Sequence, residues 1–81
     1  MNVTAVESST LWSVGYDQTL EILQLEFRNR AIYRYYDVPL AVHEGLIAAV
    51  SKGRYFNGAI RGQYRYLPAV DKRGGGAGGE A

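Results

Sequence analysis

The segment over residues 20–36 constrains the fold most strongly, because apolar and polar residues alternate along much of it with a period of two. Three large apolar residues share one side of its first half: Leu23, Leu25 and Phe27. This alternation predicts a half-buried β-strand over residues 20–27. After a short break, residues 31–36 are rich in β-forming residues and predict a second strand. The two strands therefore form a hairpin.

A three-residue break between the two strands sets the register of this hairpin. A loop of that length pairs Leu25 with Tyr33. It also pairs Leu23 with Tyr35, so that both tyrosines share the apolar face. A two-residue loop would reverse every one of these assignments. We expect the longer loop, because it places two rings beside leucines and leaves Arg34 in water.

Local signals predict the remaining elements. Residues 11–16 predict a further strand. A proline suits the first turn of a helix, and we expect a helix over residues 39–51 that stops at a left-handed Gly53. Residues 54–61 predict a short second helix or an irregular turn, and residues 63–67 a final edge strand. The expected fold is α+β: a small three-stranded antiparallel meander packed by one main helix, then the short helix or turn and the edge strand.

Length and composition bound the organisation of the chain. Its 81 residues allow one domain, which at this size buries only roughly 60% of its unfolded surface. Residues 71–81 contain five glycines and no large apolar residue, so we expect a disordered tail after a domain over residues 1–70. The absence of cysteine excludes disulfides and thiol chemistry. With neither a signal sequence nor a long apolar run, we expect a cytoplasmic protein without membrane association.

Charge is distributed unevenly along the sequence. Residues 1–27 contain four acidic residues and no Lys or Arg, whereas residues 28–66 contain seven cations against two acids. Six of these seven cations are arginine, which forks onto phosphate and stacks on rings. Several of the seven tyrosines lie beside an arginine in sequence. Rings that stack on bases and cations that neutralise phosphate are typical of proteins that bind single-stranded nucleic acid.

The candidate nucleic-acid-binding residues are Arg34, Tyr36, Arg54, Tyr55, Arg61, Tyr64 and Arg65. We assign Tyr33 and Tyr35 to core packing, since tyrosine fills volume while its hydroxyl reaches water. The same aromatic surface also suits a second function, the docking of a protein partner, because tyrosine and arginine are frequent anchors of protein interfaces.

No combination of residues indicates catalysis, a metal or a cofactor. His43 lacks a second ligand at helical spacing, and we expect it on the solvated face of its helix. The hydroxyls of Ser8 and Ser9 precede a strand, where they usually bond to the backbone. Residues 53–58 lack the P-loop lysine. An enzyme is the remote alternative, and it would need a deep pocket that joins Ser8 or Ser9 to Asp17 and an arginine.

A series of short motifs runs through the chain in a defined order. They are Ser8-Ser9, Val14-Gly15-Tyr16-Asp17, Leu25-Glu26-Phe27-Arg28-Asn29, Tyr33-Arg34-Tyr35, Val38-Pro39, Ser51-Lys52-Gly53-Arg54-Tyr55-Phe56-Asn57, Ile60-Arg61 and Tyr64. Together they resemble the KTSC domain, which is named for the C-terminus of certain lysyl-tRNA synthetases and also occurs in small stand-alone bacterial or phage proteins. The likeness covers residues 6–66.

The resemblance implies no defined enzymatic activity. The attachment of the family to a synthetase implies binding of RNA, either tRNA or single-stranded RNA. The chain departs from the family at the hairpin tip, where Arg30 replaces the usual glycine. A positive φ at this residue would cost about 1 kcal/mol.

Overall fold

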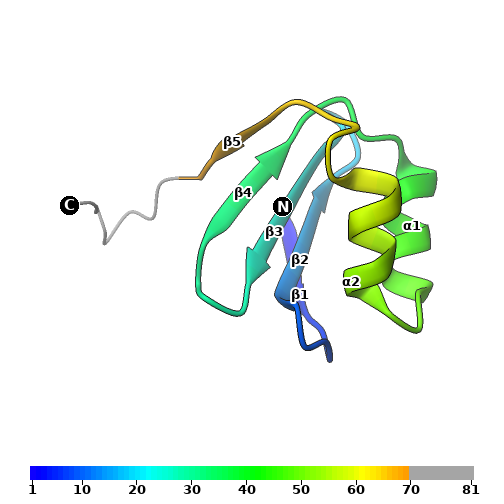
Figure 1. The fold of residues 1–81 in the computed structure, drawn as a ribbon. Coiled ribbons are helices and arrows are strands. Elements are labelled where there is room, and N and C mark those ends of the chain that lie inside the picture. Colours follow the sequence, from blue (N-terminus) through cyan, green and yellow to red (C-terminus); the bar gives the residue numbers. More distant parts are fainter. Residues whose placement is uncertain (70–81) are drawn as a thin grey trace.

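Five antiparallel strands form one sheet whose order follows the chain (Figure 1). The computed structural model describes residues 1–69, and the tail expected over residues 71–81 lies outside them. The strands are β1 (Asn2–Ala5), β2 (Leu11–Asp17), β3 (Ile22–Phe27), β4 (Ile32–Tyr35) and β5 (Tyr66–Pro68). The expected meander is present as β2, β3 and β4, and the expected C-terminal edge strand as β5, whereas β1 at the other edge is a fifth strand that was not expected.

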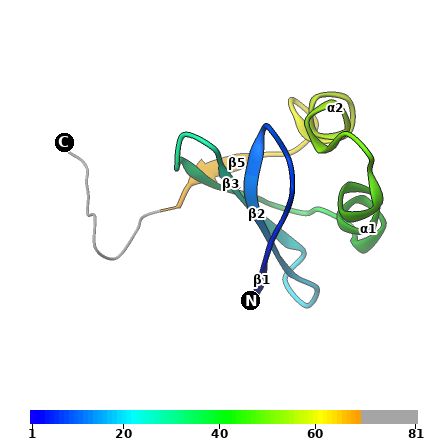
Figure 2. The same ribbon diagram turned by 90° about the horizontal axis from the view of Figure 1, so that it is seen from below.

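Helices cover one face of this sheet (Figures 1 and 2). They are α1 (Leu40–Ala48), α2 (Lys52–Tyr55) and the π-helical turn η1 (Phe56–Ile60), which continues directly from α2. The arrangement confirms the α+β class. The helix-covered face is called the inner face below, and the opposite face the outer face.

The β3–β4 hairpin has the register expected from the alternation. Leu25 pairs with Tyr33 and Leu23 pairs with Tyr35, so both tyrosines point to the inner face. The hairpin tip is closed by the Phe27 N–H, which donates to the Ala31 carbonyl at 2.9 Å. Reversal of the chain over so short a tip requires a left-handed residue, and Arg30 adopts a φ of 74°.

The helix expected over residues 39–51 is present but shorter, and the short second helix or turn expected over residues 54–61 corresponds to α2 and η1. α1 ends at Ala48, and Ala49 is extended. Ser51 then begins α2, its side chain accepting a hydrogen bond from the Arg54 N–H at 3.3 Å. Gly53 lies inside α2, so its assignment as a left-handed helix stop is wrong.

The core lies between the sheet and the helices. Its buried residues are Leu11, Val14, Leu23, Leu25, Tyr35, Val38, Leu46, Phe56 and Ile60. Strands and helices both contribute to this set, so neither layer buries its apolar side without the other.

Gly45 allows the two helices to approach each other. A Cβ at Gly45 would lie 2.2 Å from the Tyr55 hydroxyl oxygen, so only glycine leaves room for this ring. The close contact at Gly45 is made by a side chain of α2.

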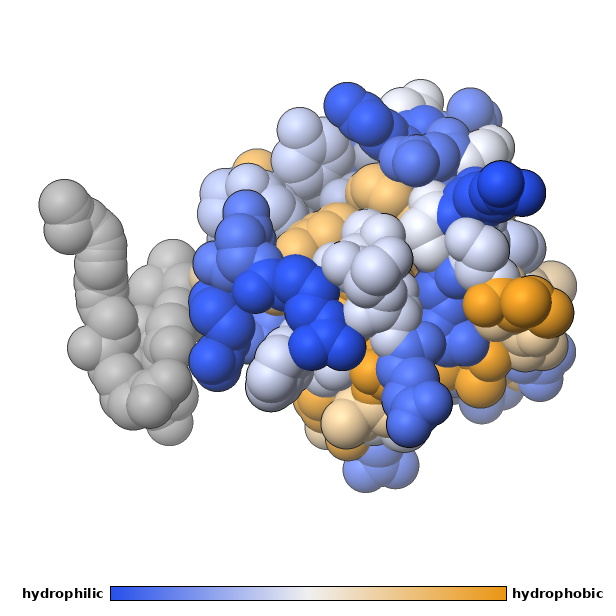
Figure 3. Space-filling model, turned by 60° about the horizontal axis from the view of Figure 1, so that its bottom comes forward, coloured by the Kyte–Doolittle hydropathy of each residue, from blue (hydrophilic) through white to orange (hydrophobic). Residues whose placement is uncertain are grey.

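The surface carries several exposed apolar side chains, which include Val3, Trp12, Tyr66 and Leu67. On the face shown in Figure 3, apolar residues are interspersed with strongly hydrophilic ones. Scattered apolar residues are usual on soluble domains, so the hollowed parts of the surface are more informative than its hydropathy.

Candidate functional site

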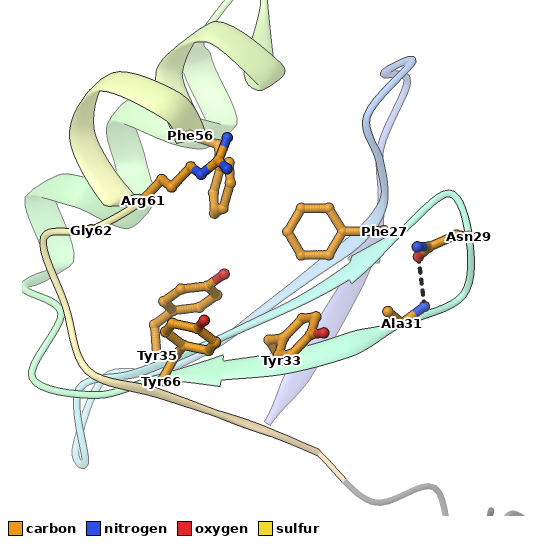
Figure 4. A pocket seen from close by; sticks show the side chains of 9 residues that line it. All are labelled: Phe27, Asn29, Ala31, Tyr33, Tyr35, Phe56, Arg61, Gly62 and Tyr66. Carbon is orange, nitrogen blue, oxygen red and sulfur yellow. Dashed lines mark hydrogen bonds between the residues drawn. The ribbon is translucent and has the colours of Figure 1, made fainter. Parts of the chain in front are cut away.

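A groove lined by aromatic rings lies on the inner face, between β4, β5 and the end of η1 (Figure 4). It encloses about 310 Å³. We call it the aromatic groove; its lining residues are Phe27, Asn29, Ala31, Tyr33, Tyr35, Phe56, Arg61, Gly62 and Tyr66. Helices α1 and α2 pack nearer the other edge of the sheet, which leaves this part of the inner face uncovered (Figure 1).

Five rings of the groove contact one another in a closed circuit. In order around the circuit they are Phe27, Tyr33, Tyr66, Tyr35 and Phe56, with centroid distances of 5.2 to 6.0 Å between neighbours. Four of the five contacts are edge-to-face, the arrangement that the ring quadrupoles favour. Each ring is held by two others, so the groove is preorganised before any ligand arrives.

The sheet and its register determine where these rings lie. Because side chains alternate along a strand, Tyr33 and Tyr35 share one face of β4. Tyr66 is the direct cross-strand partner of Tyr35. Phe27 closes the circuit from the end of β3, where it contacts both Tyr33 and Phe56.

Arg61 brings a positive charge to the groove through the π-helical turn. Its N–H donates to the Phe56 carbonyl at 2.8 Å, five residues back instead of the usual four. Figure 4 shows the Arg61 side chain beside the Phe56 ring at one wall of the groove.

The hydroxyl of Tyr35 stays protonated near neutral pH. Burial raises the pKa of Tyr35 to about 12, with smaller contributions in the same direction from Tyr66 and Tyr33. The Arg61 guanidinium acts in the opposite direction on this pKa. Tyr35 is therefore available as a neutral hydrogen-bond donor or acceptor.

A model of the KTSC domain matches residues 7–64, which is most of the chain. The chain belongs to the KTSC domain family. The fold agrees with the crystal structure of a KTSC domain protein from Yersinia pestis, with a TM-score of 0.82 and 37% identity over 84% of this chain and 96% of that one. The family resemblance drawn from the sequence motifs is confirmed.

Relatives of this KTSC domain occur both alone and within longer proteins. A protein of Stutzerimonas stutzeri, named only as uncharacterized, is 46% identical over 67 residues, which are 94% of its length. A lysine–tRNA ligase of a Nostoc species is 45% identical over 60 residues, which are 11% of the ligase and 74% of this chain. The similarity to the ligase therefore concerns one small part of that enzyme.

The structure places the seven candidate nucleic-acid-binding residues of this KTSC domain in separate regions. Arg61 alone lines the aromatic groove. Arg65 lies over the Tyr36 ring, with its guanidinium carbon 5.2 Å from the centroid. Arg34 points to the outer face, where its Nε donates to the Gln24 side chain at 2.8 Å.

The three remaining candidates lie in the helical layer and the segment that follows it. Arg54 is exposed on α2, Tyr55 packs against Gly45, and Tyr64 is half-buried against the core. The arginines and tyrosines thus do not form one shared platform. Whether any of the seven binds a nucleic acid stays a prediction.

Sequence reasoning named none of the five rings as a site residue. Tyr35 is indeed buried, with 4% exposure, yet its ring also lines the aromatic groove. Phe27 and Phe56 were treated only as packing residues, and Tyr66 only as part of an edge strand. The alternation already placed Phe27, Tyr33 and Tyr35 on one face, and this was the available signal.

His43 is not on a solvated face, and that expectation is wrong. Its ring stacks on Tyr16 with centroids 4.6 Å apart and planes 7° apart. The Tyr16 hydroxyl donates to the Val38 carbonyl, which fixes the ring that His43 covers. Within residues 1–69 the buried Nδ1 of His43 has no hydrogen-bond partner. Burial lowers the pKa of His43, and Glu44 opposes this shift.

The serines near the N-terminus have structural roles. The Ser8 hydroxyl accepts hydrogen bonds from the N–H groups of Thr10 and Leu11, at 3.0 and 3.1 Å. Asp17 instead accepts from the Leu20 N–H and lines a different hollow from Ser8.

Over residues 1–69 no three His, Asp or Glu side chains gather closely enough to hold a metal ion. None of the helices there is long and apolar enough to cross a membrane.

Proposed function

We propose that this KTSC domain is a non-catalytic module that binds single-stranded RNA in the aromatic groove. The closed circuit of five rings, with the Arg61 guanidinium at its wall, is the observation that carries the proposal. Stacking of a base on such a ring contributes about 1–3 kcal/mol and is tolerant of sequence. The guanidinium group of Arg61 can donate two parallel hydrogen bonds, which phosphate oxygens accept.

The relatives support the same ligand class. Part of a lysine–tRNA ligase is 45% identical to this chain, and an enzyme named for tRNA is a natural carrier of an RNA-binding module. The groove needs no helix dipole, metal or cofactor for this task, since stacking and one cation suffice. RNA is abundant in the cytoplasm, so the proposal keeps the cytoplasmic location expected from the sequence.

The test is a titration of fluorescently labelled single-stranded RNA with the domain at low salt. Tyr66→Ala should weaken binding by about 1–3 kcal/mol, because it removes an exposed ring from the circuit. Arg61→Gln should weaken it by about 1.5–3 kcal/mol, because it removes a charged hydrogen bond to phosphate.

The matched control is Arg54→Gln, which removes the same charge from an exposed arginine outside the groove. The proposal predicts a clearly smaller loss for this control than for Arg61→Gln. Equal losses, or no binding at tens of micromolar, would overturn it.

A protein partner is the second candidate function. The edge strand β5 exposes Tyr66 and Leu67 beside the groove, and exposed aromatic residues next to a hollow are frequent anchors of protein interfaces. In that case a pull-down should recover a protein whose retention is unaffected by nuclease, and labelled RNA should not bind.

A further inference from the structure

A second cluster of aromatic and cationic side chains lies on the outer face of the sheet. The guanidinium carbons of Arg28 and Arg30 lie 4.6 and 5.4 Å from the Trp12 ring centroid. The indole is nevertheless 44% exposed, so part of it remains open to a ligand. We call Trp12, Arg28 and Arg30 the Trp12 platform.

Hydrogen bonds hold both guanidinium groups of the platform in place. The Nε of Arg28 donates to the Ser8 carbonyl at 2.8 Å. The Nε of Arg30 donates to Glu26 at 2.6 Å, in an ion pair. Across residues 1–69 Arg28 forms no ion pair of its own, so the platform carries two cations against one carboxylate. This excess of positive charge suits an anion.

The contact with Glu26 establishes the face on which the platform lies. Glu26 alternates with Leu25 and Phe27, which point to the inner face, so Glu26 points to the outer face. Arg30 contacts both Glu26 and Trp12, which places the indole on that side as well.

The platform and the aromatic groove share one hairpin tip. Arg28 and Arg30 cover Trp12 on the outer face, whereas Asn29 between them lines the groove on the inner face. Neighbouring Cα atoms are only about 3.8 Å apart. A strand of RNA that left the groove at Asn29 would only have to cross the hairpin tip to reach the two arginines.

We propose that the Trp12 platform is a second nucleotide site, reached by the same single strand of RNA as it passes over the hairpin tip. The proposal rests on RNA binding in the aromatic groove. Arg28 and Arg30 contact the phosphates, and a base packs against the open part of the indole. Glycine would suit the φ of 74° at position 30 better than arginine does, but glycine has no charge to contact a phosphate.

Trp12 provides a direct readout, since it is the only tryptophan in the chain. The experiment compares a dinucleotide of uridine with a decanucleotide of uridine, using tryptophan fluorescence and binding affinity. Only the longer strand spans both sites, so it should quench Trp12 fluorescence and bind more tightly. The dinucleotide should bind in the groove and leave the fluorescence nearly unchanged.

The matched variants are Arg28→Gln on the platform and Arg54→Gln on α2. Arg28→Gln should weaken binding of the decanucleotide roughly tenfold and leave the dinucleotide nearly unaffected. Arg54→Gln should change neither affinity by a comparable factor. If a variant fails to fold, the fluorescence of Trp12 in the unaltered chain still tests the proposal.

The outcomes separate the two proposals. If the decanucleotide binds, depends on Arg61 and leaves Trp12 fluorescence unchanged, the platform proposal is overturned while RNA binding in the groove stands. If Arg28→Gln weakens both oligonucleotides equally, the platform proposal also fails. If neither oligonucleotide binds, both proposals fail.

Discussion

At the scale of single residues, Gly45 shows how one missing Cβ positions a neighbouring helix. The Tyr55 ring fills the space that a side chain at Gly45 would need. Gly45→Ala gains about 1 kcal/mol in helix propensity. Overpacking costs roughly 1–3 kcal/mol, so we expect a net loss of stability, measured by urea denaturation.

Gly58 provides the control for this substitution. A Cβ there would meet no atom within 4 Å, so Gly58→Ala should leave stability unchanged or raise it by up to about 1 kcal/mol. Equal effects of the two substitutions would show that Tyr55 adjusts without cost.

His43 makes the stability of the domain sensitive to pH. Because burial lowers its pKa below the ordinary 6.5, the unfolded chain binds the proton more tightly than the folded one. The contribution of His43 to the free energy of unfolding should therefore be fully present above this pH and fall as the pH drops below 6.5.

His43→Phe retains a ring against Tyr16 and removes the titrating group. In urea denaturation as a function of pH, this variant should lose the decline that begins near 6.5 in the unaltered chain. An unchanged profile would assign the decline to other groups. The sequence could not predict this environment, since Tyr16 comes from a distant strand.

At the scale of elements, the β3–β4 hairpin was predictable in detail. Its register follows from an alternating pattern and a fixed loop length, both of which are local properties of the sequence. The positive φ of Arg30 was considered only through the family resemblance, since the family usually has glycine at this position.

Arg30→Gly tests the strain at this tip. Glycine relieves about 1 kcal/mol of backbone strain, while the exposed ion pair with Glu26 contributes about 0–1 kcal/mol. We expect stability to stay the same or to rise slightly in chemical denaturation. A loss of several kcal/mol would mean that the Trp12 contacts of Arg30 hold the hairpin together.

Two features of the fold, the strand β1 and the position of Gly53, were not predicted, and each has a physical reason. The strand β1 is exposed along its whole length, so it carries no hydrophobic alternation to be recognised. Gly53 resembles a helix stop in sequence, yet a Cβ there would lie 2.4 Å from the Thr10 hydroxyl oxygen. Gly53 allows α2 to lie close to the segment before β2. This contact joins distant parts of the chain, so the local sequence does not reveal it.

At the scale of the whole molecule, arginines lie on both faces of the sheet. Arg61 lies on the inner face, and Arg28, Arg30 and Arg34 on the outer face. The arginine bias of residues 28–66 was evident in the sequence, but the grouping of these arginines was not, because the faces on which distant segments meet depend on the complete fold.

The proposed RNA path makes a prediction about salt. If Arg61, Arg28 and Arg30 each neutralise a phosphate, the logarithm of the binding constant should fall with the logarithm of salt concentration with a slope of about −2. Anisotropy titrations between roughly 50 and 200 mM salt measure this slope. A slope near zero would favour an uncharged protein partner.

The pairing of β5 with β4 differs in kind from the other strand pairings of residues 1–69. It joins segments separated by all the helices, whereas each other pair is joined by a short connection. Joining the ends of a long segment has a larger entropic cost. The three residues of β5 are also all exposed, so amide hydrogens of β5 should exchange with solvent much faster than those of β3.

Detachment of β5 would carry Tyr66 away and break the circuit of five rings. A groove opened in this way would admit a long polymer from the side, at any point along the polymer, without a free end to thread.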